Sequence, residues 1–541
     1  MTDSVSRREL LGMAAGAAVA HIRPRTGLIA QPNAPAPRLA AFAIEEKSIA
    51  ELSAAMLSGE STSRSITQQY LDRIAALDRQ GPTLRHVLET NPDALSIAGA
   101  LDAERRSGKT RGPMHGIPVL VKDNIDTADR MTTTAGSLAL EGSRASRDAH
   151  IIERLRAAGA VILGKTNLSE WANFRSTHSS SGWSGRGGQG RNPYALDRTP
   201  SGSSSGSAGA TASSYCAVAV GTETDGSITS PAAACSLVGL KPTIGLVSRS
   251  GIIPIAHSQD TAGPMARTVT DAAILLGALS GRDPRDAATS ANTSSSNVDY
   301  TRYLDANGLK GARIGVARKK YTGYSAAADA HLETALGVMK DRGAVIVDPA
   351  DITTAGKFDA AEYEVLLYEF KADLHAYLAA LPAGARARTL DDLIAFNKAH
   401  ATDEMPYFGQ EIFEMAAKKS SLASGSYRKA LASCRMLART QGLDATFAKH
   451  RLDALVAPTQ GPPALIDLVN GDPSGASSTS PSAVAGYPAI TVPMGYAHGL
   501  PLGITFMGNA WGEPMLFRLA YAYEQASKAR VAPRFLSTAS L

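Results

Sequence analysis

The chain of 541 residues is 44% hydrophobic and 19% charged, a globular composition with enough apolar material for a large core. Its formal net charge of +5 is small for this length and no long basic run occurs, which argues against a nucleic-acid partner. Its three cysteines, Cys216, Cys235 and Cys434, cannot form a disulfide framework, and no CxxC or HExxH motif offers metal-ligand spacing. We therefore expect neither a metal nor another cofactor.

The first 40 residues have the character of a targeting segment. The pair Arg7-Arg8 precedes a short apolar run, 13–20, as in a twin-arginine (Tat) export signal. The Ala-Val-Ala that closes this run fits a cleavage site, and a later cut near Ala30 is also compatible. We assign residues 1–30 to the signal and the proline-rich residues 31–40 to a linker. This predicts a periplasmic or secreted protein whose mature form is soluble, because no later run of 18 apolar residues appears.

The first part of the remaining chain alternates helical and strand patterns. Apolar residues recur at helical spacing over 48–77, where the Ser/Thr-rich residues 61–65 separate two helices and offer N-caps. Further elements are predicted in the order helix 94–106, buried strand 116–123, helix 150–158 and buried strand 159–165. The order strand, helix, strand at this spacing predicts a parallel sheet covered by helices.

Glycine and serine dominate residues 176–209, and a segment of this length inside a domain is usually functional or disordered. Small apolar residues over 208–221 then predict a closely packed helix that runs into a strand. Residues 292–441 are richer in charge and helical spacing, and are predicted as a helical elaboration. Strands at 455–458, 489–493 and 503–507 and a last helix at 515–526 complete the chain.

These patterns together predict an α/β fold. Residues 41–541 would form a single large domain with a mixed, mostly parallel central sheet covered by helices, from which the elaboration extends.

Three local patterns carry groups that could perform chemistry. Lys122 follows the apolar run 119–121, where desolvation would lower its pKa and leave a neutral amine able to act as a base; an ordinary surface lysine is the alternative. The run 201–207, Ser-Gly-Ser-Ser-Ser-Gly-Ser, has the composition of a linker, but the apolar helical stretch after it would point backbone N–H groups at a ligand. In the turn 221–228, Ser227 would lie among free N–H groups, as a nucleophile lies beside an oxyanion hole, and a plain turn is the alternative.

In this order, Lys122, Ser203 and Ser227 resemble the Ser-cisSer-Lys arrangement of the amidase signature family. The resemblance covers nearly the whole mature chain. It is carried by the Gly/Ser stretch and by dispersed blocks in the family's order, at 116–124, 164–170, 239–243, 260–265, 485–489 and 499–503.

Two departures from the commonest family pattern point to one branch. The chain has Ser-Gly-Ser-Ser-Ser-Gly at 201–206 where Gly-Gly-Ser-Ser-Gly-Gly is usual, and Asp225 stands at a glycine position of the pattern Asp-x-Gly-Gly-Ser. Both variants, together with residues 169–175 and 187–189, are similar to the peptide amidase branch, which hydrolyses the C-terminal amide of peptides.

The resemblance implies the amidase signature fold and a mechanism. Ser227 would attack the amide carbonyl, and Ser203, held after a cis peptide bond that the preceding glycine would keep uncrowded, would relay the proton to neutral Lys122. Ammonia would leave, and water would hydrolyse the acyl-enzyme by the reverse route. The oxyanion hole would consist of the backbone N–H groups of Thr224, Asp225, Gly226 and Ser227.

The resemblance implies that the substrate is a small-molecule or peptide amide and that no cofactor is required. We expect the mature protein to bind neither nucleic acid nor a membrane and to be a monomer. Substrate choice is expected to depend on the helical elaboration and on the loops around 171–190. Trp183, Arg186 and Tyr194 are candidates for a peptide groove, with surface or packing roles as the alternative.

Four other functions are compatible with parts of the pattern. The nearest is a general aliphatic or aryl amidase of the same family. The G-x-S-x-G at 202–206 also fits the nucleophile elbow of α/β-hydrolases, with Ser204 as nucleophile and His257 or His498 as base, but two prolines and no strand pattern precede it. The Gly/Ser loop could also belong to a non-catalytic phosphate- or nucleotide-binding module, but the lysine of a P-loop is missing from the chain. The transferase component of a tRNA-dependent amidotransferase shares the trio, but its tRNA and partner subunits are cytoplasmic, which conflicts with an export signal.

Overall fold

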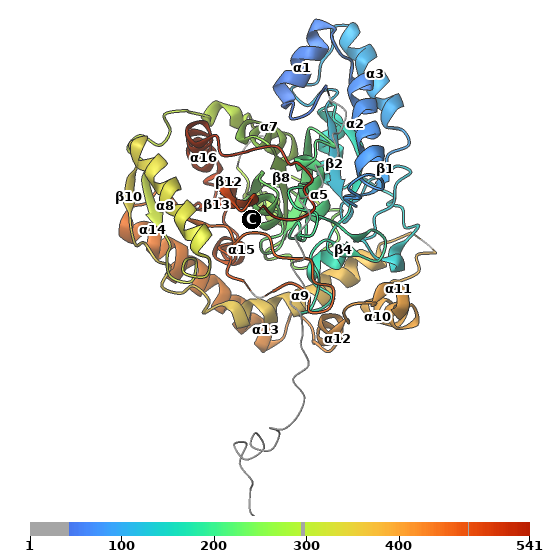
Figure 1. Ribbon diagram of the computed structural model, residues 1–541. Helices are drawn as coiled ribbons and strands as arrows, with labels where there is room; N and C mark the ends of the chain where they lie inside the picture. Colours follow the sequence, from blue (N-terminus) through green and yellow to red (C-terminus); the bar gives the residue numbers. More distant parts are fainter. Residues whose placement is uncertain (1–42, 294–297, 383, 474, 541) are drawn as a thin grey trace, which may run out of the picture. The chain divides into compact units, whose positions relative to one another are not determined.

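The computed structural model of the protein describes residues 43–293, 298–382, 384–473 and 475–540 (Figure 1). The predicted export signal, 1–30, and linker, 31–40, lie outside these residues. Among the helices that are described, none is both long and apolar enough to cross a membrane.

Eleven strands of the described chain form one sheet, in the order β1-β3-β2-β6-β8-β7-β12-β13-β11-β9-β10. Strand β2 pairs in parallel with β3 and β6, and β9 pairs in parallel with β10 and β11. The strands between these two groups pair antiparallel, as does the edge strand β1. The predicted α/β fold with a mixed sheet in one large domain is confirmed, and its parallel pairs lie toward the two edges of the sheet.

The strands of this sheet are β1 (Val87–Thr90), β2 (Pro118–Lys122), β3 (Val161–Thr166), β6 (Val218–Glu223), β7 (Val238–Lys241), β8 (Thr261–Ala266), β9 (Arg313–Val316), β10 (Val345–Val347), β11 (Ala454–Pro458), β12 (Ala489–Ala497) and β13 (Leu500–Met507). A separate two-stranded ribbon consists of β4 (Trp183–Ser184) and β5 (Gly188–Gln189).

The helices are α1 (Ile49–Ser58), α2 (Ser63–Leu77), α3 (Ala94–Arg106), α4 (His150–Ala157), α5 (Ser205–Ala212), α6 (Thr229–Ala234), α7 (Val269–Leu279), α8 (Ala326–Asp341), α9 (Asp359–Ala379), α10 (Leu390–Ala399), α11 (Ala401–Glu404), α12 (Glu411–Ala417), α13 (Gly425–Arg435), α14 (Asp444–His450), α15 (Ser480–Ala485) and α16 (Glu513–Ser527). A π-helix, Met436–Leu443, joins α13 to α14.

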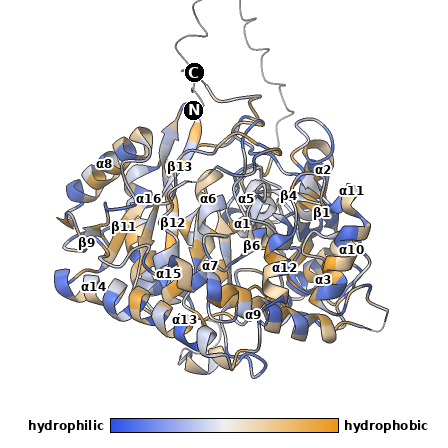
Figure 2. Cartoon of the chain, turned by 90° about the horizontal axis from the view of Figure 1, so that it is seen from below, coloured by the Kyte–Doolittle hydropathy of each residue, from blue (hydrophilic) through white to orange (hydrophobic). Residues whose placement is uncertain are grey.

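Helices cover both faces of the sheet. Helices α8 and α16 pack on β12, while α6 packs on β7, β12 and β13. Along β13, Leu502 and Ile504 contribute to the core beneath α16, whereas Gly503 between them lies against α6, so the two helices lie on opposite faces. The most hydrophilic residues lie mainly on peripheral helices such as α13 and α14 (Figure 2).

The N-terminal elements agree with the sequence prediction. The two helices predicted over 48–77 are α1 and α2, and their N-caps are Ser48 and Thr62, each of which forms a capping box. The predicted strand–helix–strand unit is β2, α4 and β3, with the two strands in parallel register. This unit fixes the direction of β2, and therefore the sheet edge at which Lys122 lies.

Residues 292–441, predicted as a helical elaboration, also contain strands of the main sheet. They contain β9, α8 and β10, and these two strands form the far edge of the main sheet. The strands have four and three residues, too few to show a periodicity in sequence. The helices α9 to α13 follow, and in Figure 1 they line the lower side of the chain.

Helix α5 is a closely packed element that carries the Gly/Ser-rich run into the core. All its residues are buried, and it contacts β2, β3, β6 and β8. A Cβ atom added at Gly209 would lie 2.0 Å from Nε2 of buried His86, so only glycine allows this approach. In sequence, the small side chains suggest a linker, but in the structure they allow the helix to pack closely against the sheet.

We predict that Gly209→Ala destabilises the protein by about 1–3 kcal/mol, because the added methyl group would overlap the His86 ring. Gly337 in α8 is the matched control, since a Cβ there meets no atom within 4 Å. Gly337→Ala should stabilise by about 0.4–1 kcal/mol. Denaturant unfolding of both variants measures the difference, and a Gly209→Ala protein as stable as the parent would contradict the packing argument.

Candidate active site

Three elements bring the candidate catalytic residues to one edge of the sheet. Lys122 is the last residue of β2, and the turn that contains Ser227 follows the neighbouring parallel strand β6. Because neighbouring parallel strands end at the same edge, the ends of β2 and β6 lie together. Ser203 lies just before α5, which packs on both strands.

The Lys122 ammonium is fully buried and hydrogen-bonded. Its Nζ lies 2.8 Å from Ser203 Oγ, 2.9 Å from Thr222 Oγ1 and 3.3 Å from the Thr222 carbonyl oxygen. Burial lowers the pKa of Lys122 to about 7, although the charges of Asp260 and Glu223 act in the opposite direction. The side chain can therefore be neutral near neutral pH.

Ser203 is held from both sides. The Gly202–Ser203 peptide bond is cis, as the family resemblance implies. The Ser203 carbonyl accepts the Ser169 N–H at 3.1 Å, and its hydroxyl faces Lys122. A Cβ at position 202 would lie 2.3 Å from Ser169 Oγ and 2.8 Å from Ser181 Oγ, so the site requires the glycine there.

Ser227 lies in a tight turn between β6 and α6. Gly226 has a φ of +78°, a conformation that favours glycine, and the Ser227 carbonyl accepts the Ser204 N–H at 3.1 Å. The Glu223 carboxylate accepts the N–H groups of Ile228 at 2.8 Å and Thr229 at 2.9 Å, which fixes the far end of the turn.

The backbone N–H groups of residues 224–227 donate to no partner in the described part of the chain, so four donors are free at the predicted oxyanion hole. Within the same residues, no hydrogen bond joins Ser203 Oγ to Ser227 Oγ. The structure thus brings Lys122 and Ser203 into direct contact and places Ser227 on a segment bonded to the residue after Ser203.

Two side chains of the turn point to supporting residues. The Thr224 hydroxyl donates to Asp260 at 2.6 Å, and the Asp225 carboxylate accepts the Thr479 hydroxyl at 2.6 Å. Asp225 is also hydrogen-bonded to Glu362 of α9, and burial raises the pKa of both carboxyl groups. A proton shared by two carboxyl groups would keep this contact attractive.

Sequence reasoning missed several residues of the site. Thr222 bonds to Lys122, and Asn124 Nδ2 donates to Thr222 Oγ1 at 3.0 Å. A cavity of about 340 Å³ begins at these residues and at Thr224, and extends between residues 252–255 and α9. Asn124 lies within the sequence block 116–124 and Thr222 within the turn 221–228, but neither residue has a role that the sequence alone predicts, because their contacts depend on the pairing of β2 with β6.

Ser204, the nucleophile in the elbow alternative, is committed to the backbone. Its buried hydroxyl donates to the Thr222 carbonyl at 3.0 Å and accepts the Thr222 N–H at 3.2 Å. No strand of the described residues lies directly before it, and His257 is hydrogen-bonded to Asp373 of α9 instead. The hydroxyl groups of Ser205 and Ser207 also donate to carbonyl oxygens, so the Gly/Ser run is an ordered core segment.

The candidate groove residues have packing roles. Trp183 is buried against Tyr407 and Phe408. Arg186 pairs with Glu89 at 3.3 Å, and the Tyr194 hydroxyl donates to a backbone carbonyl at Val531. These side chains therefore stabilise the loops around the site.

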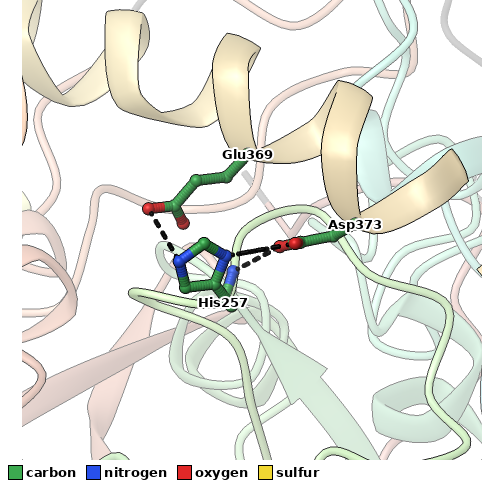
Figure 3. Close-up of side chains that lie close together, drawn as sticks. All are labelled: His257, Glu369 and Asp373. Carbon is green, nitrogen blue, oxygen red and sulfur yellow. Dashed lines mark hydrogen bonds and ion pairs between the residues drawn. The ribbon is translucent and has the colours of Figure 1, made fainter. Parts of the chain in front are cut away.

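One group of histidine and acidic side chains in the described residues is compact enough to suggest a metal site: His257, Glu369 and Asp373 (Figure 3). Nδ1 of His257 faces Asp373 at 2.8 Å, and Nε2 faces Glu369 at 3.4 Å. The two ring nitrogens thus face two different carboxylates, on opposite sides of the ring. This arrangement suits an imidazolium that is hydrogen-bonded to Asp373 and ion-paired with Glu369, since a metal ion would be bound through one ring nitrogen only.

A family model described as Amidase matches residues 65–517. The chain belongs to the amidase signature family. It is a hydrolase that acts on amide bonds.

Relatives of known structure and sequence agree with this assignment. The native peptide amidase of Stenotrophomonas maltophilia is 53% identical, covers 92% of this chain and 100% of its own, and superposes with a TM-score of 0.87. A probable amidase of Arabidopsis thaliana is 42% identical over 92% of this chain and 93% of its own. A glutamyl-tRNA(Gln) amidotransferase component of Thermobifida fusca is 37% identical over 88% of this chain and 95% of its own.

We predict that Ser204→Ala destabilises the amidase by about 1–3 kcal/mol, because the buried Thr222 N–H loses its acceptor, while amide turnover persists. Unfolding and turnover are measured on the same preparation. A folded Ser204→Ala protein without turnover would instead support Ser204 as the nucleophile.

Proposed function

We propose that this amidase hydrolyses the C-terminal carboxamide of peptides and releases ammonia, through an acyl-enzyme on Ser227. The observation that carries the proposal is the buried Lys122 Nζ 2.8 Å from Ser203 Oγ, beside a turn with four unbonded backbone N–H groups. A neutral amine, a relay hydroxyl and an oxyanion hole are the parts that amide hydrolysis requires.

In the acylation half, Ser227 Oγ forms a bond to the carbonyl carbon. Its proton passes to Ser203 Oγ, whose own proton passes to the neutral Lys122 Nζ. The negative charge on the carbonyl oxygen is stabilised by the free N–H groups of residues 224–227. The two serine hydroxyls close their hydrogen bond when substrate binds, as catalytic hydrogen bonds often do.

Collapse of the tetrahedral intermediate breaks the C–N bond. The proton on Lys122 returns through Ser203 to the nitrogen, and ammonia leaves. Water then attacks the ester along the same route, its proton passing through Ser203 to Lys122 and back to Ser227. The net reaction consumes one water, and Lys122 ends as it began.

The relatives support the peptide carboxamide as substrate. A structure 53% identical to this chain, with a TM-score of 0.88, is the peptide amidase PAM in complex with the competitive inhibitor chymostatin. Asp225, which departs from the commonest family pattern, is hydrogen-bonded to Thr479 and Glu362. It belongs to residues 224–227, the oxyanion turn, whose N–H groups form the proposed oxyanion hole. A general amidase acting on simple amides is the second candidate, supported by the probable amidase of Arabidopsis thaliana.

We also propose that the protein acts after Tat-dependent export, as a monomer on free peptides in the periplasm or outside the cell. The twin-arginine pair and the apolar run after it support this proposal. Such a location separates the chain from tRNA and argues against the role of the amidotransferase components to which it is similar.

The purified protein should release ammonia from a short peptide amide and leave the matching free-acid peptide and all internal bonds intact. Ammonia assay and product mass measure both. Ser227→Ala should lose at least about a thousandfold in kcat, because the nucleophile is absent. Hydrolysis of aryl or aliphatic amides without attack on the peptide amide would be compatible with the proposed mechanism but would exclude the peptide carboxamide as substrate. An active Ser227→Ala protein would exclude the proposed mechanism.

The pH dependence should follow the proton on Lys122. The pKa of Lys122 is lowered to about 7, so its neutral, active form is scarce below that pH and predominates above it. We expect kcat/KM to rise as the pH increases through about 7. Lys122→Arg, which stays charged, should be inactive throughout the range. A rate constant that does not change from about pH 5 to about pH 7 would contradict the assignment of Lys122 as the base.

A further inference from the structure

Helix α9 presents three acidic side chains to one loop. Glu362, Glu369 and Asp373 are spaced by seven and four residues, which places them on one face of the helix. Three consecutive residues of the loop before β8 meet them: the His257 N–H donates to Asp373 at 2.9 Å, the Ser258 N–H to Glu369 at 2.9 Å, and Gln259 Nε2 to Glu362 at 2.8 Å.

The His257 ring strengthens this attachment. It lies between the two carboxylates nearest the C-terminal end of the helix face, with Nδ1 at 2.8 Å from Asp373 and Nε2 at 3.4 Å from Glu369 (Figure 3). Nδ1 is hydrogen-bonded to Asp373, and the ion pair between Nε2 and Glu369 requires the protonated ring. Glu369 is fully buried, and its other partners are the Ser258 N–H and the Tyr427 hydroxyl, so the imidazolium is its neighbouring positive charge.

The same loop holds the oxyanion turn. Directly after His257 and Ser258, Gln259 Nε2 lies 3.4 Å from the Thr224 carbonyl oxygen, and Asp260 accepts the Thr224 hydroxyl at 2.6 Å. The other oxygen of Asp260 accepts the N–H groups of Ile255 at 2.8 Å and Ala256 at 2.9 Å, which makes the loop a single bonded unit. The position of Thr224 thus depends on where α9 holds residues 255–260.

We propose that His257, as an imidazolium bridging Asp373 and Glu369, is a positioning residue for amide hydrolysis: it fixes residues 255–260 on α9 and so sets the position of Thr224 in the oxyanion hole. The inference rests on the proposed function, since it assigns a task to Thr224 in that mechanism. His257 lines the cavity beside Thr222 and Thr224, but among the described residues it forms no hydrogen bond with Lys122, Ser203 or Ser227, so its effect passes through Gln259 and Asp260.

The charges around His257 favour the protonated ring. Its pKa is raised by the hydrogen bond to Asp373 and by the charges of Glu369 and Asp373, against burial and the charge of Arg249. Arg249 donates to the His257 carbonyl and is paired with Asp286 at 2.5 Å. Because the pKa is raised, the double bridge is complete below that pKa. As the pH rises through this pKa, the ring loses its charge and with it the ion pair to Glu369.

The test compares His257→Gln with His375→Gln in the full protein. Glutamine has one amide and cannot bridge both carboxylates as a cation, whereas His375 is an exposed residue of α9. We expect His257→Gln to lower kcat about tenfold with KM changed by less than about twofold, because donor alignment matters mostly in the transition state. His375→Gln should leave both constants unchanged. Melting temperatures recorded in parallel separate a loss of fold from a loss of alignment.

A purely structural role would not change the pH profile, so the profile is the second readout. In the parent protein, kcat should decline several-fold at alkaline pH as His257 loses its proton. This decline should be absent in His257→Gln. It should begin at lower pH in Asp373→Asn, because removing the carboxylate charge lowers the pKa of His257.

Each outcome decides the inference. A folded His257→Gln protein with the parent's kcat and alkaline profile would overturn it. A complete loss, equal to that of Ser227→Ala, would also overturn it by making His257 a general base. Ser227→Ala assayed on the same amide keeps the two proposals apart: if it is active, the serine mechanism fails, and if it is inactive while His257→Gln is normal, only the positioning role fails.

Discussion

The burial of one lysine at the end of a strand is the constraint on which the site depends. Lys122 Nζ is fully buried and is hydrogen-bonded to Ser203 and to both oxygens of Thr222. Desolvation brings its pKa to about 7, where the amine can accept and return a proton. If the cluster around it were open to water, the lysine would stay charged and could not serve as the base of the proposed mechanism.

That enclosure requires close packing of small residues. Helix α5 can approach β2 and β6 because Gly209 leaves room for His86, and Ser203 can face Lys122 because Gly202 leaves room for Ser169 and Ser181. Serine hydroxyls within the run bond to the backbone of β6 and of the run itself. The small side chains of the Gly/Ser run suggest a flexible segment in sequence. In the fold they allow close packing, and this packing makes the run rigid.

The turn that holds the proposed oxyanion hole, residues 224–227, is contacted by carboxylates on several sides. Glu223 anchors its end, Asp260 holds Thr224, and Glu362 and Thr479 hold Asp225. Helix α9 supplies Glu362 directly and binds the loop of Asp260 through Glu369 and Asp373. In the proposed mechanism, a helix far from the serines in sequence would thus help to position the N–H donors, because preorganised dipoles stabilise developing charge without further movement.

The sequence by itself determined the local elements and the catalytic candidates. Helix α3 and the β2–α4–β3 unit follow from periodicity, and Lys122, Ser203 and Ser227 follow from the order of the family's motifs. Tertiary structure decided the rest. The antiparallel middle of the sheet and the short strands β9 and β10 depend on pairing between distant segments. His257 meets Asp373 across 116 residues, and Thr222 meets Lys122 across 100. Such contacts, and the pKa values they produce, depend on burial and distance, which a linear pattern does not contain.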